Sequence, residues 1–222
     1  MKPLIIAIDG PSGAGKGTVA RAIASALGYR HVDSGAMYRA VGWKALREGV
    51  HLEDEAAVAG LAANARIDVS SARVTIDGDD VTRAIRTPEI DRAAAAVARL
   101  PRVRAVLVER QRQLGTAVGV VMEGRDIGTV VFPNAPVKLY LTAEPPARAA
   151  RRAAELRARG ETIDEAALTR DLAERDRRDA GRAHSPLRPA ADAVVLDTTP
   201  LTLDAVVERM ERLVRERWPG SS

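Results

Sequence analysis

Residues 8–18 of this chain read IDGPSGAGKGT. The stretch nearly matches the phosphate-binding loop G-x-x-x-x-G-K-(S/T), with Gly10, Gly15 and Lys16 in place. The residue after Lys16 is Gly17, however, and the expected hydroxyl comes one position later, at Thr18. The flanking sequence must therefore indicate whether this is a working loop or a chance turn.

The segments on both sides of the loop favour a working one. LIIAI (4–8) is a continuous apolar run, typical of a buried parallel strand. From Lys16 to Leu27 apolar residues recur at helical spacing, and Gly28 is a natural stop. In a strand–loop–helix unit of this kind, backbone N–H groups and the helix N-terminus face phosphate oxygens, and the lysine adds a positive charge. The unit predicts a nucleoside triphosphate site.

The rest of the chain alternates between strands and helices. The pattern predicts further strands at 29–33, 118–123, 137–142 and 193–198, and helices at about 36–48, 88–98, 101–114, 145–159, 164–180 and 202–217. Residues 66–82 read as a small antiparallel sheet with a turn at Asp77-Gly78. We expect an α/β fold of the P-loop NTPase type, doubly wound, with a mainly parallel five-stranded sheet and helices on both faces.

Two local features are predicted within this pattern. Thr162 and Glu165 have the spacing of a capping box for the helix at 164–180. The segment GRDIGTVVFPN (124–134) is rich in charge and glycine, so we expect it to be a loop outside the core.

The composition limits the classes of function. The 222 residues suit one domain, and the absence of cysteine excludes disulfides, thiolate metal sites and cysteine nucleophiles. The N-terminal apolar run is too short for a signal peptide or a membrane span, so we expect a cytoplasmic protein.

The formal charge is +4, and lysine occurs only at positions 2, 16, 44 and 138, so almost every basic residue is arginine. Arginine suits bidentate recognition of phosphates, although a GC-rich genome also explains the bias. Nucleic-acid binding is less expected because aromatic side chains for base stacking are scarce.

Three charged segments accompany the loop: DSGAMYR (33–39), EGRDIGTVVFP (123–133) and ERDRRDAGR (174–182). Taken alone, the first is compatible with a simple helix cap, the second with a surface salt-bridge loop and the third with a solvated helix end. In a parallel sheet with right-handed crossovers, the carboxyl ends of the strands lie at one edge, so we expect Gly10–Lys16, Asp33–Arg39 and Glu123–Asp126 around one cleft.

The cleft has the residues for phosphoryl transfer and not for nucleophilic catalysis. The histidines at 31, 51 and 184 are scattered, and we interpret them as surface or structural residues. An acceptor that is itself a phosphate needs no general base, because its second pKa is about 6. Such a reaction requires positioning and charge neutralisation by Arg, Lys and Mg²⁺.

Taken together, GPSGAGKGT, DSGAMYR, IRT, PRVR, EGRDIGTVVFP, APVKLYL and ERDRRDAGR resemble the bacterial cytidylate (CMP) kinase family, from Ile5 to about Leu213. The resemblance implies Mg²⁺-dependent transfer of the ATP γ-phosphoryl group to CMP or dCMP. It also implies a single P-loop kinase domain over 1–222, with its core at 1–34, 101–144 and 181–218. The monophosphate-binding region would span about 35–100, with a β insert at 66–82, and a short helical lid about 148–162.

The resemblance also implies roles for individual residues. Lys16, Arg125, Arg151, Arg152 and Arg182 would be catalytic. The ATP phosphates would be bound by Gly10, Pro11, Ser12, Gly13, Ala14, Gly15, Lys16, Gly17 and Thr18, with Arg148 and Arg157 reaching them from the lid. The acceptor would be bound by Ser34, Arg104 and Asp126 at its base, by Arg39, Arg125 and Arg182 at its phosphate, and by Arg175 and Asp179 at its sugar. No dedicated metal ligands are implied, and Mg²⁺ would be held mainly by phosphates and water, near Thr18.

One departure and two alternatives stay open. The family often has a serine near the sugar where this chain has Ala95, so the preference between CMP and dCMP is not predicted. The chain could instead be a P-loop kinase for another nucleotide or for a shikimate-like acceptor, or a nucleotide-dependent RNA-binding module. The small-molecule reading predicts a monomer whose partners are ATP and CMP or dCMP, with no membrane partner.

Overall fold

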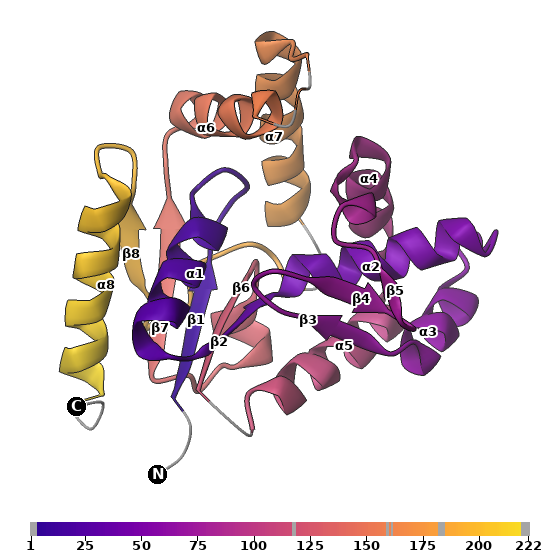
Figure 1. Ribbon diagram of the computed structural model, residues 1–222, viewed down its shortest axis with the longest axis horizontal. Coiled ribbons are helices and arrows are strands. Elements are labelled where there is room, and N and C mark those ends of the chain that lie inside the picture. The colour runs from indigo at the N-terminus through magenta and orange to yellow at the C-terminus, as the bar shows by residue number, and fades with distance from the viewer. Residues whose placement is uncertain (1–3, 117–118, 159, 161, 182–184, 219–222) are drawn as a thin grey trace.

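The computed structural model describes residues 4–116, 119–158, 160, 162–181 and 185–218, and is drawn in Figure 1. Its centre is a five-stranded sheet in the order β2-β6-β1-β7-β8. The strands are β1 (Ile5–Asp9), β2 (Arg30–Asp33), β6 (Val120–Gly124), β7 (Val137–Thr142) and β8 (Val194–Asp197). Every neighbouring pair is parallel. The predicted sheet is confirmed.

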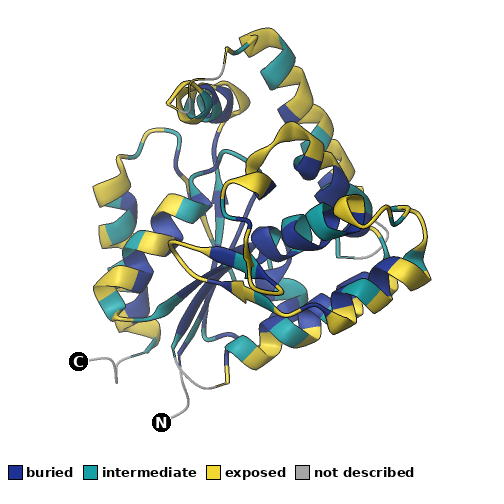
Figure 2. Ribbon diagram, turned by 45° about the vertical axis from the view of Figure 1, so that its right-hand side comes forward, coloured by how far each residue is buried: buried dark blue, intermediate teal, exposed yellow. Residues whose placement is uncertain are grey.

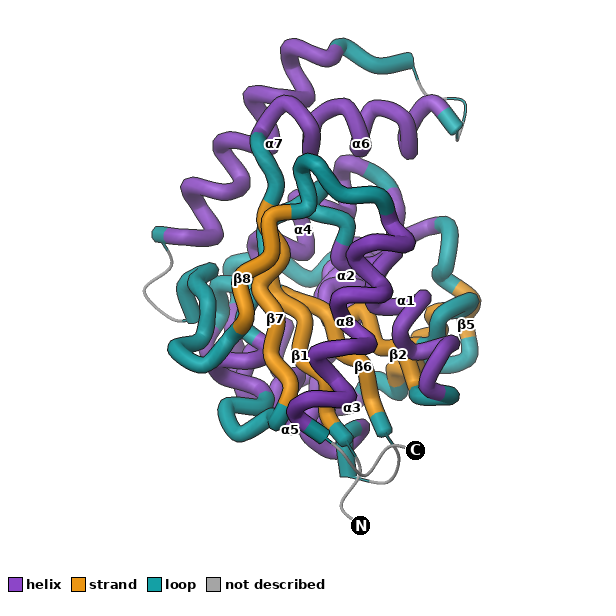
Figure 3. Tube along the Cα trace, turned by 90° about the vertical axis from the view of Figure 1, so that its left-hand side faces the viewer, coloured by secondary structure: helices purple, strands orange, loops and turns teal. Residues whose placement is uncertain are grey.

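Helices cover both faces of this sheet. Ile6 and Ile8 of β1 pack in one cluster with α1 (Lys16–Leu27) and α8 (Leu203–Arg217). Ala7, which points the opposite way, belongs to a second cluster with Val108 of α5 (Pro101–Leu114). Figure 3 shows α8 and α1 on one side of the strands, with the sheet behind them. Successive apolar side chains of β1 thus point to opposite faces of the sheet, and each face is covered by helices, which is the doubly wound arrangement.

A second body of structure lies beside the sheet. It contains α2 (Ser34–Arg47), α3 (Glu55–Asn64), α4 (Pro88–Val97) and a short 3-10 turn, Ala84–Arg86. The predicted small antiparallel sheet is present as β3 (Ile67–Val69), β4 (Val74–Ile76) and β5 (Asp79–Asp80). Except for β5, whose two residues are exposed, these elements and α5 share one hydrophobic cluster, and Figure 2 shows buried residues along their inner faces.

The predicted capping box of α7 (Glu165–Ala180) is wrong. Asp164 caps this helix, and its carboxylate accepts hydrogen bonds from the N–H groups of Ala166 and Ala167 at 2.9 and 3.0 Å. Glu165 pairs instead with Arg157 at the end of α6 (Pro145–Arg157). Asp and Ser/Thr are both good caps, and Asp164 lies two residues closer to the helix than Thr162. Helices α6 and α7 lie above the carboxyl edge of the sheet (Figures 1 and 3).

The expectation that residues 124–134 lie outside the core is also wrong. Ile127–Val131 form a π-helical turn, and Ile127, Val131 and Phe132 are buried. The segment is accommodated because the buried carboxylate of Asp9 accepts hydrogen bonds from the N–H groups of Ile127 and Gly128, at 2.8 and 2.7 Å. Burial raises the pKa of Asp9 to about 6 although those two hydrogen bonds act against the rise.

No helix in the described ranges combines the length and the apolar character needed to cross a membrane.

Candidate active site

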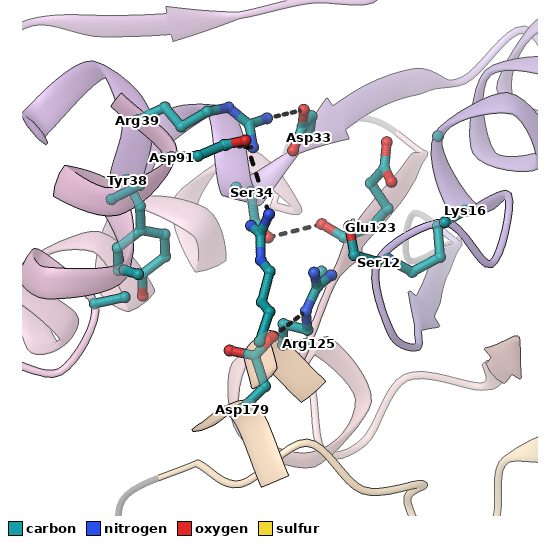
Figure 4. A pocket seen from close by; sticks show the side chains of 18 of the residues that line it. Ser12, Lys16, Asp33, Ser34, Tyr38, Arg39, Asp91, Glu123, Arg125 and Asp179 are labelled. Atoms are coloured by element: carbon teal, nitrogen blue, oxygen red, sulfur yellow. Dashed lines mark hydrogen bonds and ion pairs between the residues drawn. The ribbon is translucent and has the colours of Figure 1, made fainter. Parts of the chain in front are cut away.

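A cavity of about 540 Å³ opens at the carboxyl edge of the sheet, where the predicted segments meet. It is lined by the loop before α1, the start of α2, the end of β6 and parts of α4, α5, α6 and α7. Figure 4 shows side chains from these elements converging on it. The prediction that Gly10–Lys16, Asp33–Arg39 and Glu123–Asp126 surround one cleft is confirmed for all three segments.

The loop of residues 10–15 has the backbone of a phosphate cradle. Gly13 and Gly15 have φ values of 77° and 88°, in the left-handed region that favours glycine. A Cβ on Gly10 would lie 2.0 Å from the Leu141 carbonyl oxygen, so this position has no room for a side chain. Of the predicted loop residues, Ser12, Gly13, Gly15, Lys16, Gly17 and Thr18 line the cavity, while Ala14 is buried in the core behind it.

Lys16 is the first residue of α1, and its buried side chain folds back against the loop. Its Nζ donates to the carbonyl oxygen of Pro11 at 2.7 Å. Burial, and next the positive charge of Arg125, lower the pKa of Lys16 to about 7. An anion in the cradle would offset both effects, because it supplies the opposite charge that this buried ammonium lacks.

The three residues predicted to contact a base all line the cavity. Arg104 of α5 and Asp126 form a buried ion pair, and Arg104 also lies over the Tyr38 ring, 5.9 Å from its centre. Ser34 Oγ donates to the Glu123 carbonyl oxygen at 2.7 Å. A Cβ on Gly124 would lie 2.5 Å from Ser34 Oγ, so this glycine permits the close approach of β6 and α2.

Of the residues predicted to hold phosphate and sugar, those that the structure describes also line the cavity. Arg39 of α2 donates to Asp33 at 2.7 Å, and Arg125 donates to Asp179 of α7 at 2.9 Å. Arg125 and Asp126 therefore point to different partners, as expected for adjacent residues of an extended segment. Arg175 also lines the cavity. Arg182 lies outside the described residues.

Asp33 has two roles beside the cavity: it caps α2, and it pairs with Arg39 and Arg86. Its side chain caps α2 by accepting from the Ala36 N–H at 3.0 Å. Burial alone would raise the pKa of Asp33, but the positive charges of Arg39 and Arg86 outweigh it and hold the pKa below its usual value. Asp33 is thus an ionised partner that keeps Arg39 in place.

The four predicted lid arginines occupy different places. Arg152 lines the cavity. Arg148 is buried, donates to the carbonyl oxygens of Ala143 and Ser12 at 3.0 and 3.1 Å, and pairs with Asp176 at 2.6 Å. Arg151 instead donates to Thr198 Oγ1 and the Thr198 carbonyl oxygen, at 2.9 and 2.6 Å. Arg157 is exposed beside Glu165. The structure therefore brings Arg152 to the cavity, and not Arg151 or Arg157.

Several lining residues had no individual role in the sequence interpretation, among them Glu123, Asp33, Asp91, Arg86 and Tyr38. All but Asp91 lie within segments or motifs that the sequence analysis named. Glu123 ends an apolar strand, which is the signal that could have identified it. Its Oε1 lies 3.0 Å from Nε2 of His31, and both side chains are buried. His31 is consequently a structural residue, one of the two readings left open, and it orients a carboxylate of the cavity.

The described residues contain no group of three or more His, Asp or Glu side chains placed to hold a metal ion. The site therefore has no preformed all-protein cage in the part of the chain that the structure covers.

A glycine-rich loop between β1 and α1, a sheet in the order β2-β6-β1-β7-β8 and arginines gathered over its carboxyl edge define the class of P-loop phosphotransferases. Within that class, the chain belongs to the cytidylate kinase family, whose model matches residues 6–216. The resemblance inferred from the motifs is confirmed. Membership makes the protein a nucleoside monophosphate kinase, and neither alternative reading is favoured.

Individual relatives agree. The chain is 50% identical over 208 residues to a cytidylate kinase of Pelotomaculum thermopropionicum, covering 91% of this chain and 92% of that one. It is 46% identical over 221 residues to a cytidylate kinase of Pseudomonas aeruginosa, covering 96% of each. A solved structure of an uncharacterised protein from Eubacterium ventriosum aligns with a TM-score of 0.56 at 11% identity, over 96% of this chain and 99% of that one, which supports the fold alone.

Proposed function

We propose that the protein transfers the γ-phosphoryl group of ATP to CMP or dCMP, giving ADP and CDP or dCDP. The observation that carries this proposal is that one cavity is lined by two chemically different groups. The buried Arg104–Asp126 pair is one, and Lys16 with the phosphate cradle is the other; Arg39 and Arg125 line the same cavity.

The Arg104–Asp126 pair suits cytosine. The exocyclic N4 of cytosine donates a hydrogen bond, and a carboxylate such as Asp126 accepts it. Uracil presents a carbonyl oxygen at the same position, which would face Asp126 with like polarity. Because Asp126 and Arg104 are both buried, a base that leaves them unpaired would be strongly disfavoured.

The second group suits direct transfer between phosphates. The acceptor phosphate is already anionic near neutral pH, and no His or Cys is found among the described residues that line the cavity. Arg39, Arg125 and Arg152, together with Lys16, supply positive charge to the acceptor and the transferring group. The reaction then proceeds in line without a covalent intermediate, and Arg182 adds to these charges by its place in the family motif.

Magnesium fits this arrangement through water and phosphate. Thr18 lines the cavity beside the cradle, and a Cβ on Gly17 would lie 3.0 Å from Oε1 of Glu123, so this carboxylate is close to the start of α1. Thr18 and Glu123 would hold Mg²⁺, directly or through its waters. When bound, the ion neutralises charge on the β- and γ-phosphates.

Residues 148–162, which begin within α6, are proposed to act as a lid. Arg152 already reaches the cavity, and Arg148 ties α6 to the phosphate cradle at the Ser12 carbonyl oxygen. Closure would exclude water from the transferring phosphate. The enzyme is proposed to act as a monomer.

A coupled ADP-release assay tests the proposal, with CMP, dCMP, UMP, AMP, GMP and shikimate offered in parallel. We expect CMP and dCMP to stimulate ADP release well above the other acceptors. Ala95 places no hydroxyl against the sugar, so the CMP to dCMP ratio is read from the same experiment. ADP release that CMP does not stimulate would refute the proposal.

A further inference from the structure

Asp91, in the first turn of α4, lies where two cavities meet. It lines the cavity of the site and also a second one of about 880 Å³, bounded by α4 on one side and by α6 and α7 on the other. Figure 4 shows Asp91 next to Arg39 inside the first cavity. No sequence motif pointed to this residue.

The Asp91 carboxylate is shared among three arginines from three helices. Its oxygens lie 4.0 Å from Arg39 Nη1 of α2, 3.6 Å from Arg152 Nη2 of α6 and 3.8 Å from Arg175 Nη1 of α7. All three distances exceed the usual length of a hydrogen bond. The carboxylate is therefore a common counter-ion, and none of the three guanidinium groups holds it in a directional bond.

The helix dipole does not account for this position. Acidic residues in the first turn of a helix are favourable because of the partial positive charge there, and α4 has Glu89 as well as Asp91. Glu89 is exposed and lines neither cavity. The two carboxylates thus share the helix end, but only Asp91 is surrounded by arginines, which makes Glu89 a matched control.

A phosphate is the other group that three converging guanidinium groups would bind, and it carries the same sign of charge as Asp91. Arg39 and Arg152 are among the arginines proposed to hold the acceptor and the transferring phosphate. A phosphate bound to them would lie beside the Asp91 carboxylate in a partly buried site, where repulsion between like charges is weakly screened.

We propose that Asp91 is a positioning residue that acts as an internal anion for the acceptor site. Arg39 and Arg152 also have a closer carboxylate each, Asp33 at 2.7 Å and Glu155 at 3.0 Å. While no acceptor is bound, Asp91 adds the charge that these two arginines share with Arg175, and so opposes the mutual repulsion of all three. When an acceptor arrives, it opposes the phosphate, so that tight binding requires the base contacts at Asp126 as well. Inorganic phosphate, which has no base, is thereby kept out of the site. The inference rests on the proposed acceptor site.

The test measures binding of inorganic phosphate, both by calorimetry and as competitive inhibition against CMP. The test variants are D91N and D91S. E89Q is the control for the change in net charge and in the charge at the helix end. R39Q is the control that shows whether phosphate binds at these arginines. Asp91 is partly exposed, so we expect both substitutions to fold; the unfolding midpoint of each variant checks this.

We expect D91N and D91S to lower the dissociation constant of phosphate at least tenfold, whereas E89Q changes it less than twofold and R39Q raises it. KM for CMP and kcat should both fall in D91N, because the diphosphate product leaves more slowly when the opposing charge is gone. A merely structural role would not produce this joint decrease.

Two results would overturn the inference. Equal phosphate constants in D91N and E89Q would make Asp91 an ordinary helix-end charge. A weaker constant in D91N than in the wild type would show that the carboxylate organises the arginines for phosphate instead of opposing it. If CMP fails to stimulate ADP release by the wild type, the proposed function is lost, while the calorimetric comparison still decides the role of Asp91.

Discussion

Asp126 is the residue on which base selection should depend. Replacing it with Ala removes the acceptor for cytosine N4, and we expect the ratio of kcat/KM for CMP over UMP to fall at least tenfold, in line with roughly 1–3 kcal/mol for a good base-edge contact. Asp126→Asn keeps the shape and adds a donor, so it should shift the ratio further toward UMP. Steady-state kinetics with both acceptors measure this.

One result would contradict the role of Asp126 in selecting the base. An unchanged ratio in both variants would show that another residue excludes UMP. Because the substitution also leaves Arg104 buried without its partner, the unfolding midpoint of each variant must be compared first.

Lys16 should make ATP binding depend on pH. Its pKa in the free protein is lowered to about 7, and the phosphates of ATP should raise it again. At pH 8 the free protein therefore has mostly neutral Lys16 and the complex has charged Lys16, so binding should take up nearly one proton. At pH 6 the lysine is charged in both states, and this uptake should vanish.

Calorimetry of ATP binding in buffers of different ionisation enthalpy measures that uptake, with Lys16→Met as the control that lacks the group. Proton uptake that is the same at pH 6 and pH 8, or that survives in Lys16→Met, would contradict the assignment.

The side chain of Glu123 lies so close to Gly17 that it explains why this position of the loop has no side chain. A Cβ there would lie 3.0 Å from Glu123 Oε1 and 3.3 Å from Arg21 Nη1, closer than most Cβ contacts. We expect Gly17→Ser to reduce kcat about tenfold or more by displacing Glu123, an effect equivalent to about 1.4 kcal/mol in the barrier. Gly17→Ala should show most of the same loss. Full activity in both would mean that the late hydroxyl at Thr18 is incidental.

At the scale of elements, the start of α7 offers a direct comparison of two caps. Asp164→Ala should lower the free energy of unfolding by about 1 kcal/mol, because two N–H groups of the first turn lose their acceptor. Thr162→Ala should leave it unchanged, since Asp164 and not Thr162 caps the helix. Urea denaturation of the two variants measures the difference. A larger loss of stability in Thr162→Ala than in Asp164→Ala would show that Thr162 caps the helix after all.

Elements with strong local signals were predictable from the sequence. The helix at 16–27 was predicted with its observed bounds, because Gly28 provides the left-handed residue that ends it. α3 was missed because Glu55–Asn64 is dominated by alanine and has little amphipathic contrast, so its one clear signal was the Asp54 cap. Residues 124–134 were misjudged because their hydrogen bonds depend on Asp9, more than a hundred residues away in the chain.

The lid arginines show a different limit. Arg148, Arg151, Arg152 and Arg157 lie within one helix, and a motif assigns them a shared purpose. Which of them reaches the cavity depends on the partners that tertiary structure offers: Thr198 for Arg151, Asp176 for Arg148 and Glu165 for Arg157. Long side chains with several rotamers follow such partners, so spacing alone could not separate them.

At the scale of the whole molecule, the site is where the topology brings distant segments together. The loop after β1, the start of α2, the end of β6 and α7 are far apart in sequence and share one edge of the sheet. This convergence was predictable, because parallel strands with right-handed crossovers leave their carboxyl ends at one edge. Asp91 was not predictable, since its partners are brought to it from three helices only by the packed fold.

The central claim is direct transfer from ATP to the phosphate of CMP within this one cavity. A single-turnover reaction with ATP labelled at the γ-phosphate, excess enzyme, Mg²⁺ and CMP tests it most directly. We expect the label to pass into CDP at the rate at which ADP forms, with none retained on the protein and little as inorganic phosphate. Label that accumulates on the protein, or that appears as inorganic phosphate without labelled CDP, would contradict the account.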